Sequence, residues 1–171
     1  VSKRNEDFES VAEALMPELI TAASRQGGAL ELAPSSPLVW FGDLNYRIPL
    51  EFEEVINAID SNDLASIIAH DQLVVERDAQ RVFLGFTESP ILFAPTYKFR
   101  AGTTDYDRRE KKKSAAKGGG KKPPRVPAYC DRVLWCGPGI RPLVTASTNH
   151  PLGYTSHLHV TASDHKPVSH S

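Results

Sequence analysis

The segment Leu38-Val39-Trp40-Phe41-Gly42-Asp43-Leu44-Asn45-Tyr46-Arg47 has the strongest structural signal in the chain. Its first four residues are apolar, with the β-branched and aromatic content of a short buried strand. The strand ends at a glycine, and Asp43 and Asn45 follow two residues apart. Because residues i and i+2 point the same way on an extended backbone, this carboxylate and this carboxamide are predicted to project side by side.

Two interpretations of Asp43 and Asn45 fit this spacing. Both residue types favour turns, so an ordinary turn accounts for them. Alternatively, a carboxylate can orient or deprotonate a water molecule while an adjacent amide donates a hydrogen bond to an oxyanion. The other motifs of the chain distinguish between these two interpretations.

The composition is that of one ordinary globular domain. The chain has 171 residues, of which 40% are hydrophobic and 24% charged, and its formal net charge is −1. This length allows a sizeable core, and no apolar stretch approaches the ~20 residues of a membrane-spanning helix. Two cysteines are too few for a disulfide scaffold, so we expect a reducing, cytoplasmic setting. The sequence does not begin with Met, and we expect a processed or partial chain.

Four segments have helical patterns. Residues 5–25 repeat apolar side chains at three- and four-residue steps, and Pro17 is predicted to kink or divide that helix. Shorter helices are predicted over residues 52–59, 64–70 and 72–80, with Asp63 as an N-cap. Short helices that follow one strand indicate an α/β or α+β architecture.

Three further segments resemble strands that end in ionisable groups. Residues 91–94 lead into Tyr97, Lys98 and Arg100, and residues 133–135 follow Asp131 and Arg132. Residues 154–162 alternate apolar and polar side chains and lead into Asp164, His165 and Lys166. On the polar face of this last segment, His157 and His159 form either a metal-ligating pair or simply an exposed surface.

Residues 108–124 form a basic insertion without periodicity, rich in Lys and Gly. Such a segment can attract phosphate-rich ligands, an anionic membrane or nucleic acid, or serve as a nuclear import signal. A solvated insertion without a dedicated partner is the alternative.

Together the strand ends contain what metal-assisted hydrolysis of a phosphate ester requires. One carboxylate can handle the attacking water, others can hold a cation or orient a histidine, and the cationic groups can meet phosphoryl oxygens. A hard cation bound by carboxylates, water and phosphate would be Mg²⁺ rather than zinc.

Four motifs in order resemble the inositol polyphosphate 5-phosphatases of the endonuclease/exonuclease/phosphatase superfamily: Trp40-Phe41-Gly42-Asp43-Leu44-Asn45-Tyr46-Arg47, Pro95-Thr96-Tyr97-Lys98-Phe99, Arg125-Val126-Pro127-Ala128-Tyr129-Cys130-Asp131-Arg132-Val133-Leu134 and Ser163-Asp164-His165-Lys166-Pro167-Val168. The resemblance implies a DNase I-like α/β (α+β) sandwich of two sheets. It also implies Mg²⁺-dependent removal of the 5-phosphate from a phosphoinositide or a soluble inositol polyphosphate, with possible peripheral contact with an anionic membrane.

The resemblance implies a catalytic role for four residues. Asp43 would activate water, Asn45 would bind the scissile phosphate, and Asp131 would hold the imidazole of His165 against that phosphate. Asp164 would support the metal. The substrate-binding residues implied for a neighbouring ring phosphate and its surroundings are Tyr97, Lys98, Lys122, Arg125, Arg132 and Lys166.

The resemblance covers only the C-terminal part of the family's catalytic domain, so residues 1–171 are expected to be one partial domain. The family's Gln-Glu motif, whose Glu holds Mg²⁺, is absent, and Pro123 stands where the family commonly has Lys. Two alternatives therefore remain open: a catalytically incomplete module that binds phosphoinositides, and a nuclease of the same superfamily, for which the basic segment would be the argument.

Overall fold

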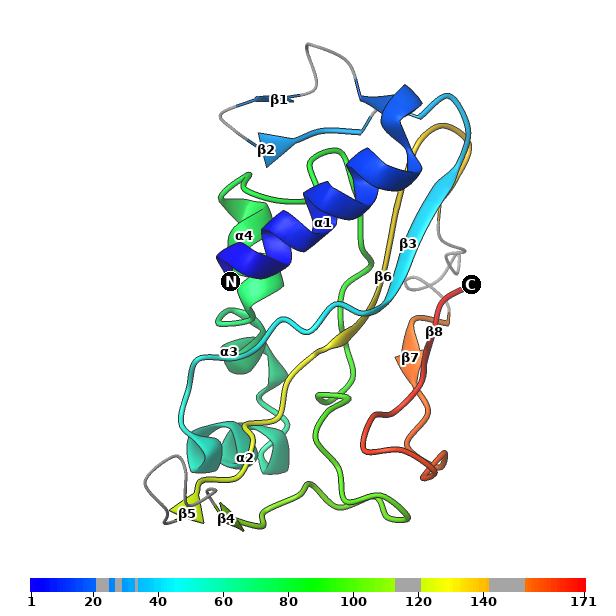
Figure 1. Ribbon diagram of the computed structural model, residues 1–171. Helices are drawn as coiled ribbons and strands as arrows, with labels where there is room; N and C mark the ends of the chain where they lie inside the picture. Colours follow the sequence, from blue (N-terminus) through cyan, green and yellow to red (C-terminus); the bar gives the residue numbers. More distant parts are fainter. Residues whose placement is uncertain (21–24, 27–28, 33, 113–120, 142–152) are drawn as a thin grey trace.

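The computed structural model describes residues 1–20, 25–26, 29–32, 34–112, 121–141 and 153–171. Three helices separate an N-terminal group of strands from a C-terminal group (Figure 1). The elements are α1 (Ser2–Leu15), η1 (Pro17–Leu19), β1 (Arg25–Gln26), β2 (Ala29–Leu30), β3 (Leu38–Asp43), α2 (Phe52–Asp60), α3 (Leu64–Ile68), α4 (Gln72–Asp78), β4 (Lys111–Lys112), β5 (Lys121–Lys122), β6 (Asp131–Cys136), β7 (Thr155–Ser156) and β8 (Val168–Ser169). The described chain is thus a mixed α+β structure.

The centre of the molecule is the antiparallel pair β3–β6, drawn as adjacent cyan and yellow ribbons in Figure 1. Its register runs from Leu38 opposite Cys136 to Asp43 opposite Asp131. Directly opposed residues of an antiparallel pair share a face of the sheet. Two strands that are distant in sequence therefore bring both carboxylates to the same end and the same face.

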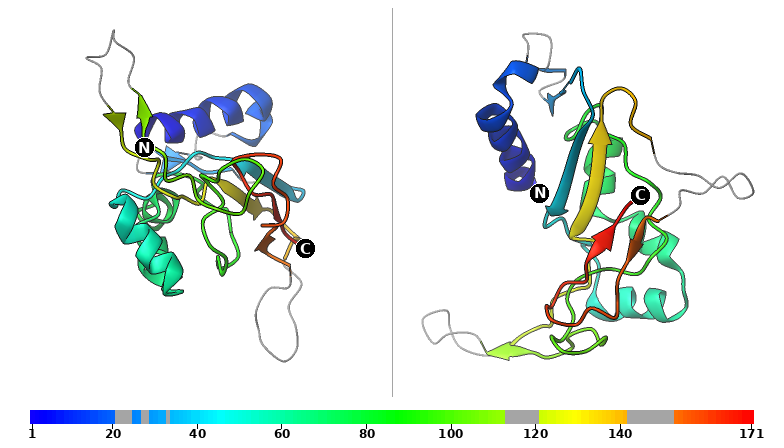
Figure 2. Two further views of the ribbon diagram at one scale, coloured as in Figure 1. Left: turned by 90° about the horizontal axis from the view of Figure 1, so that it is seen from below. Right: turned by 90° about the vertical axis from the view of Figure 1, so that its right-hand side faces the viewer.

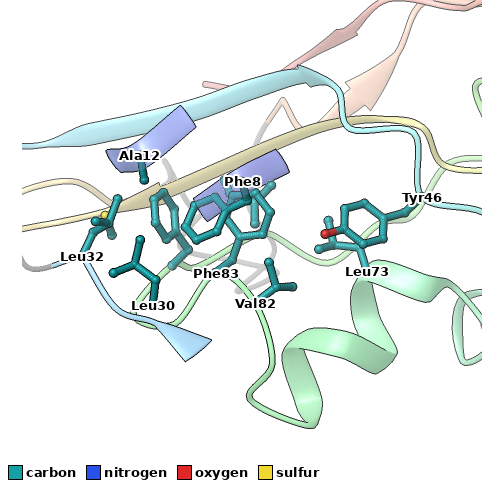
Figure 3. Packing of buried hydrophobic residues seen from close by; sticks show 11 residues of the cluster. Phe8, Ala12, Leu30, Leu32, Tyr46, Leu73, Val82 and Phe83 are labelled. Carbon is teal, nitrogen blue, oxygen red and sulfur yellow. The ribbon is translucent and has the colours of Figure 1, made fainter. Parts of the chain in front are cut away.

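The other face of this pair packs on helix α1. Phe8 and Ala12 are buried there, and the Phe8 ring lies 5.0 Å from the Trp40 ring and 4.1 Å from the Phe83 ring, centroid to centroid. Figure 3 shows Phe8, Phe83 and Leu30 in this cluster. The predicted helix over residues 5–25 is too long: α1 ends at Leu15, because Pro17 cannot donate a helical hydrogen bond and instead begins η1. Residues 21–24 of that prediction lie outside the described residues.

The helices after β3 match their predictions closely in position. α2 begins with Glu53 and Glu54 in its first turn, which suits the helix dipole. Asp63 caps α3 by accepting a hydrogen bond from the Ser66 amide, as expected, and Asp71 caps α4 through the Val74 amide. The buried faces of α2 and α3 join a second core of seven residues: Ile48, Val55, Ile67, Ile91, Phe93, Tyr129 and Tyr154.

Three strand predictions need correction. The stretch after Pro37 is a strand, but it is not buried: Val39 is 45% and Phe41 73% exposed, because only Leu38 and Trp40 face the α1 side. Residues 91–94 do not form a strand. Of the alternating segment 154–162, only β7 forms a strand pair, with β8. The Val160 amide closes a turn by donating to the His157 carbonyl, and the Val160 carbonyl accepts a hydrogen bond from the Lys166 ammonium.

The described ends of the basic segment lie at the edge of the molecule, away from β3 and β6 (Figure 2). Its described ends form the short antiparallel pair β4–β5, and residues 113–120 lie outside the described residues. In the part of the chain that the structure describes, no helix is both long and apolar enough to cross a membrane.

Candidate active site

The candidate active site is built around His165, which lies between the two opposed carboxylates. Its Nδ1 is 3.0 Å from Asp131 Oδ2 and 3.2 Å from Oδ1, whereas its Nε2 is 3.9 Å from Asp43 Oδ2. With Nδ1–H donating to Asp131, Nε2 is left free on the Asp43 side. The pairing of Asp131 with His165 that the resemblance implied is therefore present in the structure.

A third segment, residues 95–99, holds His165 in this place. The Lys166 amide donates to the Thr96 carbonyl at 2.8 Å, and the Phe99 amide donates to the Asp164 carbonyl at 2.9 Å. On its other side Tyr97 exchanges backbone hydrogen bonds with Ala128. Segment 95–99 thus joins the loop that carries His165 to the loop that leads into β6.

Asp131 is positioned by its side-chain partners as well. The buried Thr96 hydroxyl donates to Asp131 Oδ2 at 2.6 Å. Burial raises the pKa of Asp131, although the hydrogen bonds from Thr96 and His165 oppose this shift. A carboxylate held between two donors fixes both the orientation and the tautomer of the imidazole.

The turn after β3 is both a turn and part of the site. The Asn45 amide donates to Asp43 Oδ1 at 2.8 Å, and Asn45 adopts a left-handed φ of 58° that asparagine tolerates. The half-exposed Asp43 carboxylate faces His165, and the Asn45 side chain is exposed beside it. The two interpretations of this pair are therefore compatible, because the turn presents both groups.

Two side chains pack over this turn. Arg47 donates from Nη2 to Asn45 Oδ1, and its guanidinium carbon lies 4.4 Å from the centroid of the Tyr97 ring. The Tyr97 ring in turn lies 4.6 Å from the His165 ring. Arg47 and Thr96 were present in the sequence motifs, but only the tertiary structure shows what they contact.

Lys98 and Asp164, the predicted phosphate and metal ligands, pair with each other. The hydrogen bond from Lys98 holds the pKa of Asp164 below its ordinary value. Among the described residues, no three His, Cys, Asp or Glu side chains gather to hold a metal ion. The described side chains therefore do not fit a magnesium site by themselves, because an ammonium group already neutralises Asp164.

The remaining predicted cations differ in accessibility. Arg125 is exposed and lines a pocket of about 300 Å³ together with Arg47. Lys122 belongs to β5, and its side chain lies outside what the structure describes. His157 and His159 have rings 5.8 Å apart, and within the described ranges no third ligand joins them.

Two predicted substrate ligands do not reach the candidate site in this structure. The Arg132 side chain is fully buried and donates to Asp71 and Glu88, all at 2.7 Å. Lys166 is also fully buried, and its ammonium donates to the carbonyls of Thr103 and Val160. Both cations lie beside site residues in sequence, but the alternation of side chains turns them into the interior, where protein groups satisfy them.

The comparisons with known proteins agree with this geometry. The model of the endonuclease/exonuclease/phosphatase family 2 matches residues 1–171. The chain is 34% identical to mouse type II inositol 1,4,5-trisphosphate 5-phosphatase over 98% of its own length, and 38% identical to human phosphatidylinositol 4,5-bisphosphate 5-phosphatase A over 83%. Both alignments cover 14% of the relative, so the chain spans a small part of their length.

Two solved structures show the same fold. The inositol polyphosphate 5-phosphatase domain of SPsynaptojanin, in complex with inositol (1,4)-bisphosphate and calcium, superposes with a TM-score of 0.67 and 34% identity, covering 99% of this chain and 41% of that one. Cimex nitrophorin, described as a ferrous NO complex, superposes with a TM-score of 0.59 and 28% identity. This match covers 85% of this chain and 42% of the nitrophorin chain. The predicted DNase I-like class is confirmed. The chain belongs to the endonuclease/exonuclease/phosphatase family 2, among the inositol polyphosphate 5-phosphatases.

Proposed function

We propose that this chain is the C-terminal portion of a phosphatase that hydrolyses the 5-phosphate of phosphoinositides or soluble inositol polyphosphates. The observation that carries the proposal is the Asp131–His165–Asp43 arrangement, formed by motifs that this chain shares with 5-phosphatases. The proposal concerns the whole protein, because the chain spans 41% of the related catalytic domain.

In the proposed reaction, each residue acts at a stated atom. Asp43 accepts a hydrogen bond from the attacking water, and His165 Nε2 contacts a phosphoryl oxygen while Asp131 holds Nδ1. Because Asn45 Oδ1 accepts from Arg47, the side-chain nitrogen Nδ2 of Asn45 can donate to the scissile phosphate. The exposed Arg125, with Tyr97, Lys98 and Lys122, supplies the surroundings of a neighbouring ring phosphate.

Magnesium dependence is part of the proposal. A Mg²⁺ ion supplies electrostatic stabilisation of a phosphoryl group when bound. Its ligands would include donors outside this chain, because those of the described part do not form a set. We further propose that the protein works in the cytoplasm and that residues 108–124 attract anionic membranes.

The test is phosphate release from inositol 1,4,5-trisphosphate by the longest protein that contains this sequence. Release is expected with Mg²⁺ and not with EDTA, and inositol 1,4-bisphosphate, which lacks the 5-phosphate, should release none. Asp43→Asn should lower the rate by about 100-fold or more, by analogy with the loss of other catalytic groups. Unchanged release by Asp43→Asn would refute the assigned role.

A second candidate is binding without turnover. It is favoured by the lack of a metal-ligand cluster among the described side chains and by the nitrophorin likeness, since one fold hosts unrelated functions. Binding to phosphatidylinositol 4,5-bisphosphate vesicles without phosphate release would support it. Cleavage of plain or abasic duplex DNA would instead support the nuclease alternative.

A further inference from the structure

One charged group at the candidate site, the Arg47 guanidinium, has a hydrogen-bonding nitrogen that the described residues leave without a partner. This guanidinium lies over the Tyr97 ring at 4.4 Å and uses Nη2 to hold Asn45 Oδ1. Its other terminal nitrogen, Nη1, is buried and has no hydrogen-bond partner among the described residues. A buried, charged donor without an acceptor is costly, so such a group calls for a specific explanation.

The surroundings of Arg47 point to an anionic acceptor. Arg47 and Arg125 line the same pocket of about 300 Å³, whose other lining residues are Ile48, Pro123, Pro124 and Val126. Two guanidinium groups and no carboxylate line this pocket among the described residues. Apolar walls strengthen the attraction between such cations and an anion, because they lower the local dielectric constant.

Arg47 also connects the groups that the proposed reaction uses. One fork of its guanidinium fixes the Asn45 side chain, and its face supports the ring of Tyr97, which packs against His165. A planar fork can hold two acceptors in a fixed relation, which the single ammonium of a lysine cannot do.

We propose that Arg47 is a phosphate-binding residue: Nη2 orients Asn45, and Nη1 donates to an anionic oxygen of the same phosphorylated polyol. This proposal rests on the proposed function and adds a residue and a direction of binding to it. When an anion occupies the pocket lined by Arg47 and Arg125, Arg47 thereby also fixes the orientation of the Asn45 side-chain carboxamide.

The test compares Arg47→Met and Arg47→Lys with a matched control. Arg81→Met is the control, because the Arg81 guanidinium also makes two hydrogen bonds, to Glu76, away from the site. Arg47→Met should lower kcat/KM for inositol 1,4,5-trisphosphate by about 10- to 100-fold, the loss expected for a hydrogen bond from a charged donor. Arg47→Lys should have a KM close to the wild-type value but a kcat as low as that of Arg47→Met. Arg81→Met should change neither KM nor kcat by more than about twofold.

Binding separates this proposal from the proposed function. Calorimetric titration with inositol 1,4-bisphosphate should show a Kd raised about 10-fold or more by Arg47→Met, even in a protein without turnover. Wild-type binding without phosphate release would defeat the proposed function alone. If both Arg47 variants fold, as judged by their thermal midpoints, and keep wild-type Kd and kcat/KM, Arg47 has only a structural role and the proposal fails. If Arg47→Met does not fold, the kcat of Arg47→Lys is the deciding measurement. A purely structural role predicts that Arg47→Lys keeps the wild-type kcat, whereas the proposal predicts that its kcat falls.

Discussion

Replacing Arg132 by Met should remove a large part of the stability of this fold. The Arg132 side chain is fully buried and donates to Asp71 and to both oxygens of Glu88, each at 2.7 Å. The side chains of Asp71 and Glu88 are 0% and 4% exposed. Burial by itself lowers the pKa of Arg132, but these two carboxylates hold it well above its ordinary value.

The size of the effect follows from what the substitution leaves behind. Methionine fills the volume but leaves the buried Asp71 carboxylate without its cation, and it leaves Glu88 with the longer 3.2 Å pair to Arg77. Breaking a buried ion pair from one side costs about 3–5 kcal/mol, a large share of the ~5–15 kcal/mol that stabilises a typical domain. Because Asp71 also caps α4 and Arg132 follows Asp131 on β6, the loss should reach the active site.

Urea unfolding followed by the fluorescence of Trp40 and Trp135 measures this loss as a change in the free energy of unfolding. The double variant Arg132→Met, Asp71→Asn should be more stable than Arg132→Met alone by about 1–3 kcal/mol, because no carboxylate at position 71 is then buried without a cation, while Glu88 keeps its pair with Arg77. The carboxamide that Asp71→Asn introduces would still carry an oxygen to cap α4. A loss below about 1 kcal/mol for Arg132→Met, or a double variant less stable than the single one, would refute the reasoning.

Three further predictions concern other parts of the fold. Burial raises the pKa of Cys130 to about 12 and that of Cys136 to about 11, so neither thiol should react with Ellman's reagent in mildly alkaline buffer until the protein is denatured; rapid labelling of the native protein would contradict this. Burial lowers the pKa of His170, whose Nε2 lies 2.7 Å from Ser89 Oγ. The unfolded chain therefore binds more protons, and stability should fall as the pH drops from about 6.5 through the lower folded value; His170→Gln should flatten this part of the stability profile, and an unchanged profile would argue against it. Phe41→Ser should change the free energy of unfolding of this chain by less than about 0.5 kcal/mol, because Phe41 is 73% exposed, and should reduce self-association in light scattering; a larger loss would mean that Phe41 is covered in solution.

Much of the local structure followed from sequence patterns. The apolar run at Leu38 predicted a strand, Pro17 predicted a kink or break in the first helix, and Asp63 predicted a cap. Each of these depends on residues close together in the chain, so local chemistry determines it. The strand expected over residues 154–162 failed because alternation alone supplies no partner, and the buried Lys166 ammonium takes the Val160 carbonyl instead.

The motifs alone predict that Asp43, Asn45, Asp131 and His165 are site residues, because these motifs stand in a recognisable order. Which of their charged neighbours lie at the candidate site depends on tertiary packing. Arg132 and Lys166 turn into the interior and find protein acceptors there, whereas Arg47 packs on Tyr97 and keeps one buried nitrogen unpaired among the described residues. The physical reason is that a motif specifies residue types along the chain, while the β3–β6 register and the packing of segment 95–99 specify which way each side chain points.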